Sequence, residues 1–214
     1  MTVARILAID PGQYNAGSGL AAAHKYDCRR MTKNAELRAE HAGAGARQAP
    51  SREGDAIDPR DLRRALAGFP TGVTVVTARA AGGQLAGVTV NSFCSVSLAP
   101  PLLLWCLSKT APSRSVFTHA SHFVIHVLAA NQTHLSKRFS SPSTDKFADL
   151  EFDEGLGRAP VLGGTVATFE CRLAQEYEGG DHLILVGEVE RYRYADRHPL
   201  LFHGGDYDIP ARRK

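Results

Sequence analysis

The sequence predicts a mainly β fold with a few helices, in which antiparallel strands close in a barrel-like arrangement. Two observations support this prediction. Six or seven short segments rich in β-branched and apolar residues follow one another between turn signals. Only one or two helical segments could act as crossovers between parallel strands. Because a parallel pair needs a long crossover connection, usually a helix, this order favours antiparallel pairing over a doubly wound sheet.

Three short helices are predicted. The first begins at Asp58-Pro59, where an acceptor side chain precedes a proline at the first helical position, and it ends near Gly68. Apolar residues recur along it at roughly helical spacing: Leu62, Leu66 and Phe69. The second helix begins at Pro112, and Asn131 caps the third, which runs through Phe139.

The predicted strands are short and apolar. Residues 74–78 and 84–88 form a hairpin around Ala81-Gly82-Gly83. The remaining strand segments are 94–98, 102–107, 123–128, 165–173 and 183–190, and 191–194 is a further candidate. Turn residues separate these segments, which favours one compact β-rich domain.

Length and charge bound the class of protein. The chain has 214 residues, of which 43% are hydrophobic and 22% charged, so one ordinary domain with extensions can bury a sizeable core. Its 25 basic and 22 acidic residues leave a formal charge of only +3, which gives no reason to expect a nucleic-acid or membrane partner. The longest apolar run, 102–107, is far shorter than the roughly 20 residues that cross a bilayer.

The chain divides near residue 57. Residues 1–57 are dominated by Ala, Gly, Arg and Gln and have too few large apolar groups for a core, so we expect a low-order N-terminal extension. Residues 58–208 carry the regular pattern and form the expected domain, and 209–214 form a C-terminal tail. Residues 5–12 resemble the first strand of ribonuclease-H-like nucleases, but the further carboxylate-bearing strands of that family do not follow. A chance match is therefore the preferred interpretation.

The cysteines indicate a reducing compartment. They show no C-x-x-C spacing and are expected to be reduced, buried thiols: Cys28, Cys94, Cys106 and Cys171. The N-terminus has no apolar run long enough for an export signal, so a cytoplasmic location is expected. No histidine spacing is typical of a metal site, and no metal is predicted.

The segment 87–97 is the first of three that could bind a ligand. Hydroxyl and amide side chains are dense there although apolar strands flank it: Thr89, Asn91, Ser92, Ser95 and Ser97. Because side chains alternate along a strand, Ser95 and Ser97 are expected to share one face, opposite Cys94, Val96 and Leu98. Hydroxyls beside a core suit a planar heterocycle with polar edges. An ordinary half-exposed strand after a polar turn is the alternative.

The second segment, 106–113, runs from a strand end towards a helix start. Unpaired amides of a helix beginning at Pro112, beside Lys109 and nearby hydroxyls, are suited to a phosphate group. Many strand-to-helix loops have this composition, so a plain loop remains an alternative. Neither the P-loop nor the G-x-G-x-x-G motif occurs, so any nicotinamide cofactor would bind without a Rossmann unit.

The third segment, 178–189, contains a Gly-Gly-Asp turn that leads into a strand. His182 begins that strand. A hydrogen-bonded structural histidine is the default interpretation at such a position, and a ligand-facing histidine is the alternative.

In this order and spacing, the three segments closely resemble the short-chain flavin reductase family, whose members supply reduced flavin to two-component monooxygenases. Phe69–Thr77, Asp145-Lys146-Phe147 and Pro199–Tyr207 belong to the same pattern. The resemblance spans roughly Asp58 to Tyr207 and does not reach residues 1–57.

The resemblance implies a split β-barrel of the FMN-binding type that forms a homodimer. FAD or FMN would bind at the barrel edge near the subunit interface, with NADH or NADPH as co-substrate. The residues it implies for cofactor binding are Thr71, Thr89, Val90, Asn91, Ser92, Ser95, Ser97, Ser108, Lys109, Ser113, Gly180, Asp181 and Tyr207. His182 would face the nicotinamide and is the one candidate for a catalytic role.

Within that implied set, Thr89 to Ser92 would line the isoalloxazine ring, and Ser95 and Ser97 would continue the wall toward the ribityl chain. Ser108, Lys109 and Ser113 would meet the phosphate. At the last motif this sequence departs from the family, because Asp208 follows Tyr207 where many relatives have an arginine.

The expected function is that of an NAD(P)H:flavin oxidoreductase that supplies reduced flavin, by diffusion, to an oxygenase component. One alternative is a reductase of the same fold acting on a ferric chelate or a corrinoid. Another is a non-catalytic flavin- or haem-binding split-barrel protein. The Gly-Asp-His turn and the polar segment 87–97 favour an enzyme.

Overall fold

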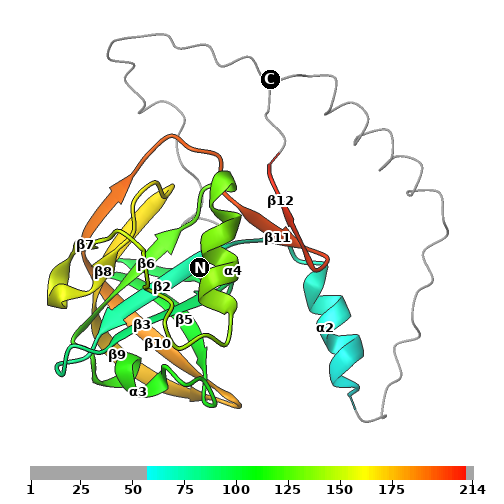
Figure 1. The fold of residues 1–214 in the computed structure, drawn as a ribbon. Helices are drawn as coiled ribbons and strands as arrows, with labels where there is room; N and C mark the ends of the chain where they lie inside the picture. The colour runs from blue at the N-terminus through cyan, green and yellow to red at the C-terminus, as the bar shows by residue number, and fades with distance from the viewer. Residues whose placement is uncertain (1–56, 211–214) are drawn as a thin grey trace, which may run out of the picture. The chain divides into compact units, whose positions relative to one another are not determined.

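The computed structural model describes residues 57–210, and they form a mainly β fold around one seven-stranded sheet (Figure 1). In spatial order its strands are β3 (Leu85–Val90), β2 (Thr74–Arg79), β6 (His122–Val127), β9 (Ala167–Gly179), β10 (His182–Tyr194), β5 (Pro101–Ser108) and β4 (Cys94–Leu98). Each neighbouring pair is antiparallel. The predicted mainly β class with few helices and the predicted antiparallel pairing are therefore confirmed. The predicted extension 1–57 lies outside the described residues except for Ile57.

The two end strands of this sheet, β3 and β4, are consecutive in the chain and do not pair with each other. The link between them is Asn91–Phe93. The tight hairpin loops that would pair two such strands need residues with positive φ, and none of these three has one. The expected closure of the barrel is thus not present as a hydrogen-bonded ring among residues 57–210.

Two small sheets and short helices complete the described part. β1 (Thr71–Gly72), β11 (Leu201–His203) and β12 (Asp206–Asp208) form one sheet, and β7 (Asp153–Glu154) pairs with β8 (Pro160–Val161). The α-helices are α2 (Pro59–Ala67), α3 (Arg114–His119) and α4 (Thr133–Ser140), and the 3-10 turns are η3 (Ala130–Gln132) and η4 (Leu156–Arg158).

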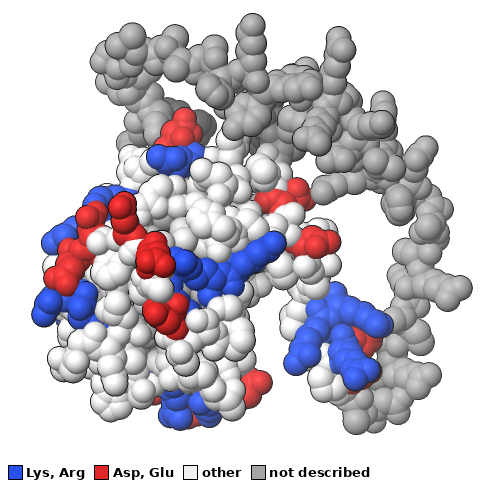
Figure 2. Space-filling view, viewed as in Figure 1, with Lys and Arg blue, Asp and Glu red and all other residues white. Residues whose placement is uncertain are grey.

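Helix α2 begins where the sequence predicts. The Asp58 carboxylate accepts a hydrogen bond of 2.8 Å from the Arg60 amide, and Gly68 caps the other end. Its side chains are exposed, and its arginines gather in one basic group (Figure 2). Helix α2 hydrogen-bonds to the β11–β12 turn through the Gly204 amide and the Ala67 carbonyl.

Other predicted boundaries need correction. Helix α3 begins at Arg114 and not at Pro112, and a 3-10 turn precedes α4, which begins at Thr133 and not just after Asn131. The predicted strands 183–190 and 191–194 are one strand, β10, because β9 pairs with it along its length across two register shifts. Pairing with the distant strand β9 sets the length of β10, which local patterns could not show.

The core has two main parts. Trp105 packs edge-on against Phe117 and Phe123, with ring centroids 5.0 and 5.8 Å apart, in the part enclosed by the main sheet. The second part joins α4 to β2 and to the β11–β12 hairpin through Phe139, Leu200 and their neighbours. Gly87 makes the approach of α4 possible, because a Cβ there would lie 2.3 Å from the Phe139 ring.

The cysteines match the prediction in part. Cys94, Cys106 and Cys171 are free thiols. Cys171 is buried, and burial raises its pKa to about 12. Cys94 is exposed and Cys106 is only half-buried, contrary to the expectation of buried thiols. Cys94 is exposed because β4 is an edge strand with a neighbour on one side only.

Candidate functional site

The end of β5 and the start of β10 bring four of the predicted residues together. Ser108 lies directly opposite His182 in the antiparallel register. The next residue, Lys109, donates its amide to the Asp181 carbonyl at 3.0 Å. The Lys109 ammonium forms an ion pair with Glu178. Segments about seventy positions apart in the sequence thus form one local surface.

The Gly-Asp-His segment forms the turn between β9 and β10. Gly179 pairs with His182, which leaves Gly180 and Asp181 as a two-residue turn, and Gly180 has φ +68°. Glycine at the first central position is typical of a type II′ hairpin turn. The turn therefore places Asp181 and His182 side by side at the end of two interior strands of the sheet.

His182 is half-buried and has a carboxylate partner. Its Nδ1 lies 2.7 Å from the Asp181 Oδ1, and 44% of its side chain is accessible. The hydrogen bond with His182 lowers the pKa of the Asp181 carboxyl. A carboxylate that hydrogen-bonds to Nδ1 fixes the orientation of the imidazole ring, and Nε2 can then bind a different group.

Ser92 fastens the link between the two end strands to β5. Its hydroxyl oxygen accepts a hydrogen bond of 2.9 Å from the Cys106 amide. Cys106 is two residues before Ser108, so the Asn91–Phe93 link lies beside the Ser108–His182 pair in the sheet. The Ser92 hydroxyl holds the backbone, and the Asn91 side chain next to it is exposed.

A second group of predicted residues meets at α4. The Thr89 hydroxyl donates to the Ser136 carbonyl at 2.7 Å, and the Ser136 hydroxyl lies 2.8 Å from the Tyr207 hydroxyl. The Val90 carbonyl accepts a hydrogen bond of 2.9 Å from the Thr74 hydroxyl. Strand β3 and the last motif are thus connected through one turn of α4.

Thr71 lies next to this second group. It pairs with Phe202 across β1 and β11, and the Phe202 and Tyr207 rings are 5.7 Å apart. The Thr71 hydroxyl oxygen is buried and has no hydrogen-bond partner among the described residues. Because an unpaired buried hydroxyl is costly, this group has a free capacity that a ligand could use.

The predicted common face of Ser95 and Ser97 is wrong. Ser95 pairs with Leu103 and Ser97 with Leu102, so a bulge at Val96 shifts the register. Consecutive residues of β5 point to opposite faces, and their partners on β4 therefore do so as well. The Ser97 hydroxyl accepts a hydrogen bond of 3.3 Å from the Ala99 amide.

The helix-based argument for a phosphate site is weaker than the sequence indicated. Helix α3 has only six residues, and Ser113 precedes it without a side-chain capping bond. The Ser108 hydroxyl hydrogen-bonds to the Thr110 hydroxyl at 2.9 Å. Among residues 57–210 the Ser113 hydroxyl therefore makes no capping bond, while Lys109 and Ser108 each have a protein partner.

Three residues next to the predicted set were missed as contributors. Ser136 joins Thr89 to Tyr207, Glu178 pairs with Lys109, and Lys146 binds the Phe139 and Gly87 carbonyls at 2.8 and 3.3 Å. Burial lowers the pKa of Lys146. A serine between the apolar Leu135 and Phe139 of a predicted helix was the available signal for Ser136, which is fully buried.

Within residues 57–210, no three His, Cys, Asp or Glu side chains gather in a way that could hold a metal ion. A search of the same residues finds no helix that is long and apolar enough to cross a membrane.

Comparison with known proteins identifies the class. The family model described as the flavin reductase like domain matches residues 66–210. This chain belongs to that family.

Particular relatives agree with this assignment. The chain is 49% identical over 154 residues to the FMN reductase (NADH) SmoA of Agrobacterium fabrum, which covers 72% of this chain and 87% of that protein. It is 42% identical over 161 residues to the reductase component of the flavin-dependent trigonelline monooxygenase of Acinetobacter baylyi, covering 75% of this chain but only 52% of that relative. The structure of the NADH:FAD oxidoreductase SgcE6 of Streptomyces globisporus, in complex with NAD and FAD fragments, matches with a TM-score of 0.68 and 40% identity, covering 74% of this chain and 98% of that chain.

Proposed function

We propose that this protein is an NADH-dependent flavin reductase that supplies reduced FAD or FMN to a separate oxygenase component. The observation that carries the proposal is the cross-strand pair of Ser108 and His182 beside Lys109 and Asp181. This pair brings the segment after β5 and the Gly-Asp-His turn together at one end of these two strands. The similarity to the FMN reductase (NADH) SmoA and to the NADH:FAD oxidoreductase SgcE6 supports flavin as the acceptor and NADH as the donor. The similarity to the trigonelline monooxygenase reductase component supports a separate oxygenase.

The described residues fit a flavin in two respects. The Thr71 hydroxyl has no hydrogen-bond partner among the described residues, and it would gain one from a polar edge of a ligand if β1 moved to expose it. The Thr89 and Ser92 hydroxyls hold the backbone around Asn91, so this segment would contact the ring through its main chain and the Asn91 amide. Lys109, Ser108 and Ser113 would hold the phosphate. Ser97 would lie between the phosphate and the ring, and Ser95, which faces the other side of the sheet, would not contact the same part of the flavin.

When bound, a flavin supplies the N5 atom that accepts a hydride from the nicotinamide C4. The protein's own part is orientation. Asp181 holds the His182 imidazole by its Nδ1, so that Nε2 can bind the carboxamide of the nicotinamide. Gly180 leaves room at the turn for the approach of that ligand, and Tyr207 orders the last motif through Ser136.

A homodimer with a split-barrel architecture is part of the proposal. The edge strand β4 exposes Leu98, which is 80% accessible, and α2 exposes Leu62 and Leu66. Apolar side chains on an unpaired sheet edge are stabilised when another chain covers them. A second subunit at this edge would lie next to the Asn91–Phe93 link and complete the flavin site.

The test is steady-state oxidation of NADH and of NADPH with FAD, FMN or a ferric chelate as the acceptor. We expect flavin-dependent oxidation of NADH, with a slower reaction of the ferric chelate in the absence of flavin. Turnover that requires the ferric chelate and ignores flavin would contradict the proposal. Sedimentation with flavin present checks the dimer, and a monomer at micromolar concentration would count against it.

A further inference from the structure

A cavity at the other end of β10 from His182 has the composition of an anion site. Its volume is about 200 Å³, smaller than the roughly 300–1,000 Å³ of pockets for drug-sized ligands. It therefore suits a small ion or one end of a larger molecule. Strand β10 has 13 residues, and at about 3.3 Å per residue its two ends are about 40 Å apart along the strand. The cavity is thus separate from the flavin site proposed above.

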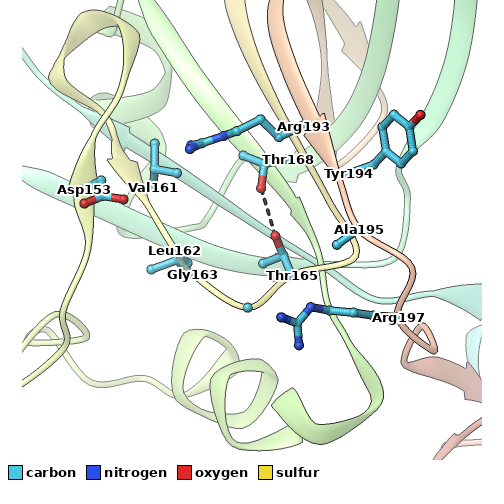
Figure 3. A pocket seen from close by; sticks show the side chains of 11 residues that line it. Asp153, Val161, Leu162, Gly163, Thr165, Thr168, Arg193, Tyr194, Ala195 and Arg197 are labelled. Atoms are coloured by element: carbon cyan, nitrogen blue, oxygen red, sulfur yellow. Dashed lines mark hydrogen bonds between the residues drawn. The ribbon is translucent and has the colours of Figure 1, made fainter. Parts of the chain in front are cut away.

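Two arginines line this cavity. Figure 3 shows Arg193, at the end of β10, beside Thr168, and Arg197, just after the strand, beside Thr165, with the threonine pair between the two arginines. Arg197 forms no ion pair with any residue between 57 and 210. The carboxylate nearest to Arg193 is Glu170, 3.9 Å away.

Glu170 neutralises this arginine only in part. Its buried carboxylate also pairs with Arg191 at 3.4 Å and accepts the Leu156 amide at 2.8 Å. Asp153 lies on the opposite rim of the cavity and is exposed (Figure 3). Two guanidinium groups therefore face one exposed carboxylate across the cavity, and the balance is positive.

Neutral donors complete the lining. The Thr165 and Thr168 hydroxyls lie 2.9 Å apart, as Figure 3 shows, and Thr168 is buried. When two hydroxyls hydrogen-bond to each other, the proton of one of them stays free to donate. The Gly163 carbonyl is held by the Gln132 amide at 2.8 Å, and Gly164 has φ +75°. The N–H groups of Gly164 and Thr165 have no acceptor in the described part of the chain.

We propose that this cavity binds a phosphate group, either free inorganic phosphate or the phosphate monoester end of a nucleotide. Guanidinium groups bind tetrahedral oxyanions through paired, charge-assisted hydrogen bonds. Backbone N–H groups beside a residue with positive φ add further donors of the kind found in anion-binding nests. This inference does not depend on the flavin reductase function.

The test is an NMR titration of the ¹⁵N-labelled full chain in a buffer without phosphate, at constant ionic strength. Inorganic phosphate and AMP are added separately. We expect saturable shifts of the Gly164 and Thr165 amide signals. The double variant Arg193→Gln, Arg197→Gln should weaken this binding at least about tenfold, because it removes the charged donors.

Two control variants separate this site from others. Arg63→Gln removes an exposed arginine of α2, and Lys109→Gln removes the cation of the other phosphate site proposed above; both should leave the Gly164 and Thr165 shifts unchanged. Tighter binding of AMP than of phosphate identifies a nucleotide as the source of the phosphate group, and equal affinity identifies the free ion. Unmoved Gly164 and Thr165 signals, or unchanged affinity in the double variant with its remaining amide spectrum intact, overturn the proposal.

Discussion

The hydroxyl of Ser136 lies 2.8 Å from the hydroxyl of Tyr207, a residue 71 positions later in the chain. Ser136 is fully buried in α4, and its carbonyl accepts a hydrogen bond from Thr89 on the other side. One helical residue therefore connects the end of β3 with the last motif. The family resemblance indicated both ends of this connection, but not the residue between them.

Tyr207→Phe and Ser136→Ala should each lower the free energy of unfolding by about 0.5–1.5 kcal/mol, the usual effect of losing a neutral hydrogen bond. Because both changes remove the same bond, the double variant should lose less than the sum of the two. Urea unfolding of all four proteins measures this coupling. None of these substitutions removes the Thr89 hydroxyl or the Ser136 carbonyl. The hydrogen bond between them is therefore kept in all four proteins and does not contribute to the differences. Strictly additive losses would show that the two hydroxyls do not interact in solution.

Gly87→Ala should destabilise the protein by about 1–3 kcal/mol, the usual effect of overpacking. The added Cβ would lie 2.3 Å from the Phe139 ring, and α4 would have to move away from β3. Gly82→Ala is the matched control, because a Cβ at that glycine meets nothing within 4 Å. Urea unfolding of the two variants gives the comparison, and similar losses in both would rule out the close approach of α4.

The pKa of His126 should lie near 4, far below its ordinary value. Burial lowers it to about 4 from 6.5, and its Nε2 accepts a hydrogen bond of 3.0 Å from the Leu162 amide. A histidine whose pKa is lowered by folding stabilises the native state fully above pH 6.5. As the pH falls from 6.5 towards 4, the unfolded chain binds the proton first and the stability decreases.

Because of this pKa shift, the free energy of unfolding should fall by about 3 kcal/mol between pH 6.5 and pH 4. An NMR titration of the His126 ring signals measures the pKa directly, with the exposed His203 as the reference. A His126 pKa near 6.5 in the folded protein would contradict the buried, hydrogen-bonded position.

Substitutions at Ser97 and His182 should affect different substrates. Ser97→Ala should raise the apparent flavin constant about three- to tenfold, the effect of one lost hydrogen bond, and leave the nicotinamide constant unchanged. His182→Ala should do the reverse, with a lower maximal rate if the imidazole also positions the nicotinamide. Steady-state kinetics with each substrate varied in turn distinguishes the two. An unchanged nicotinamide constant in His182→Ala would assign that histidine a structural role only.

The sequence by itself determined the features that depend on neighbouring residues. Asp58 and Pro59 begin a helix, Gly180 and Asp181 turn a hairpin, and apolar segments of suitable length become the strands of an antiparallel sheet. These features follow from side-chain acceptors, allowed φ values and alternation along a few residues, which the order of amino acids displays directly.

The tertiary structure alone decided what depends on pairing between distant segments. It placed Ser108 opposite His182, put a bulge at Val96 that separates Ser95 from Ser97, and brought Arg193 and Arg197 to one cavity. A shift of one residue in strand register reverses the face of every side chain that follows. Register is set by the packing of the whole sheet and its core, so no local pattern around these residues could have shown it.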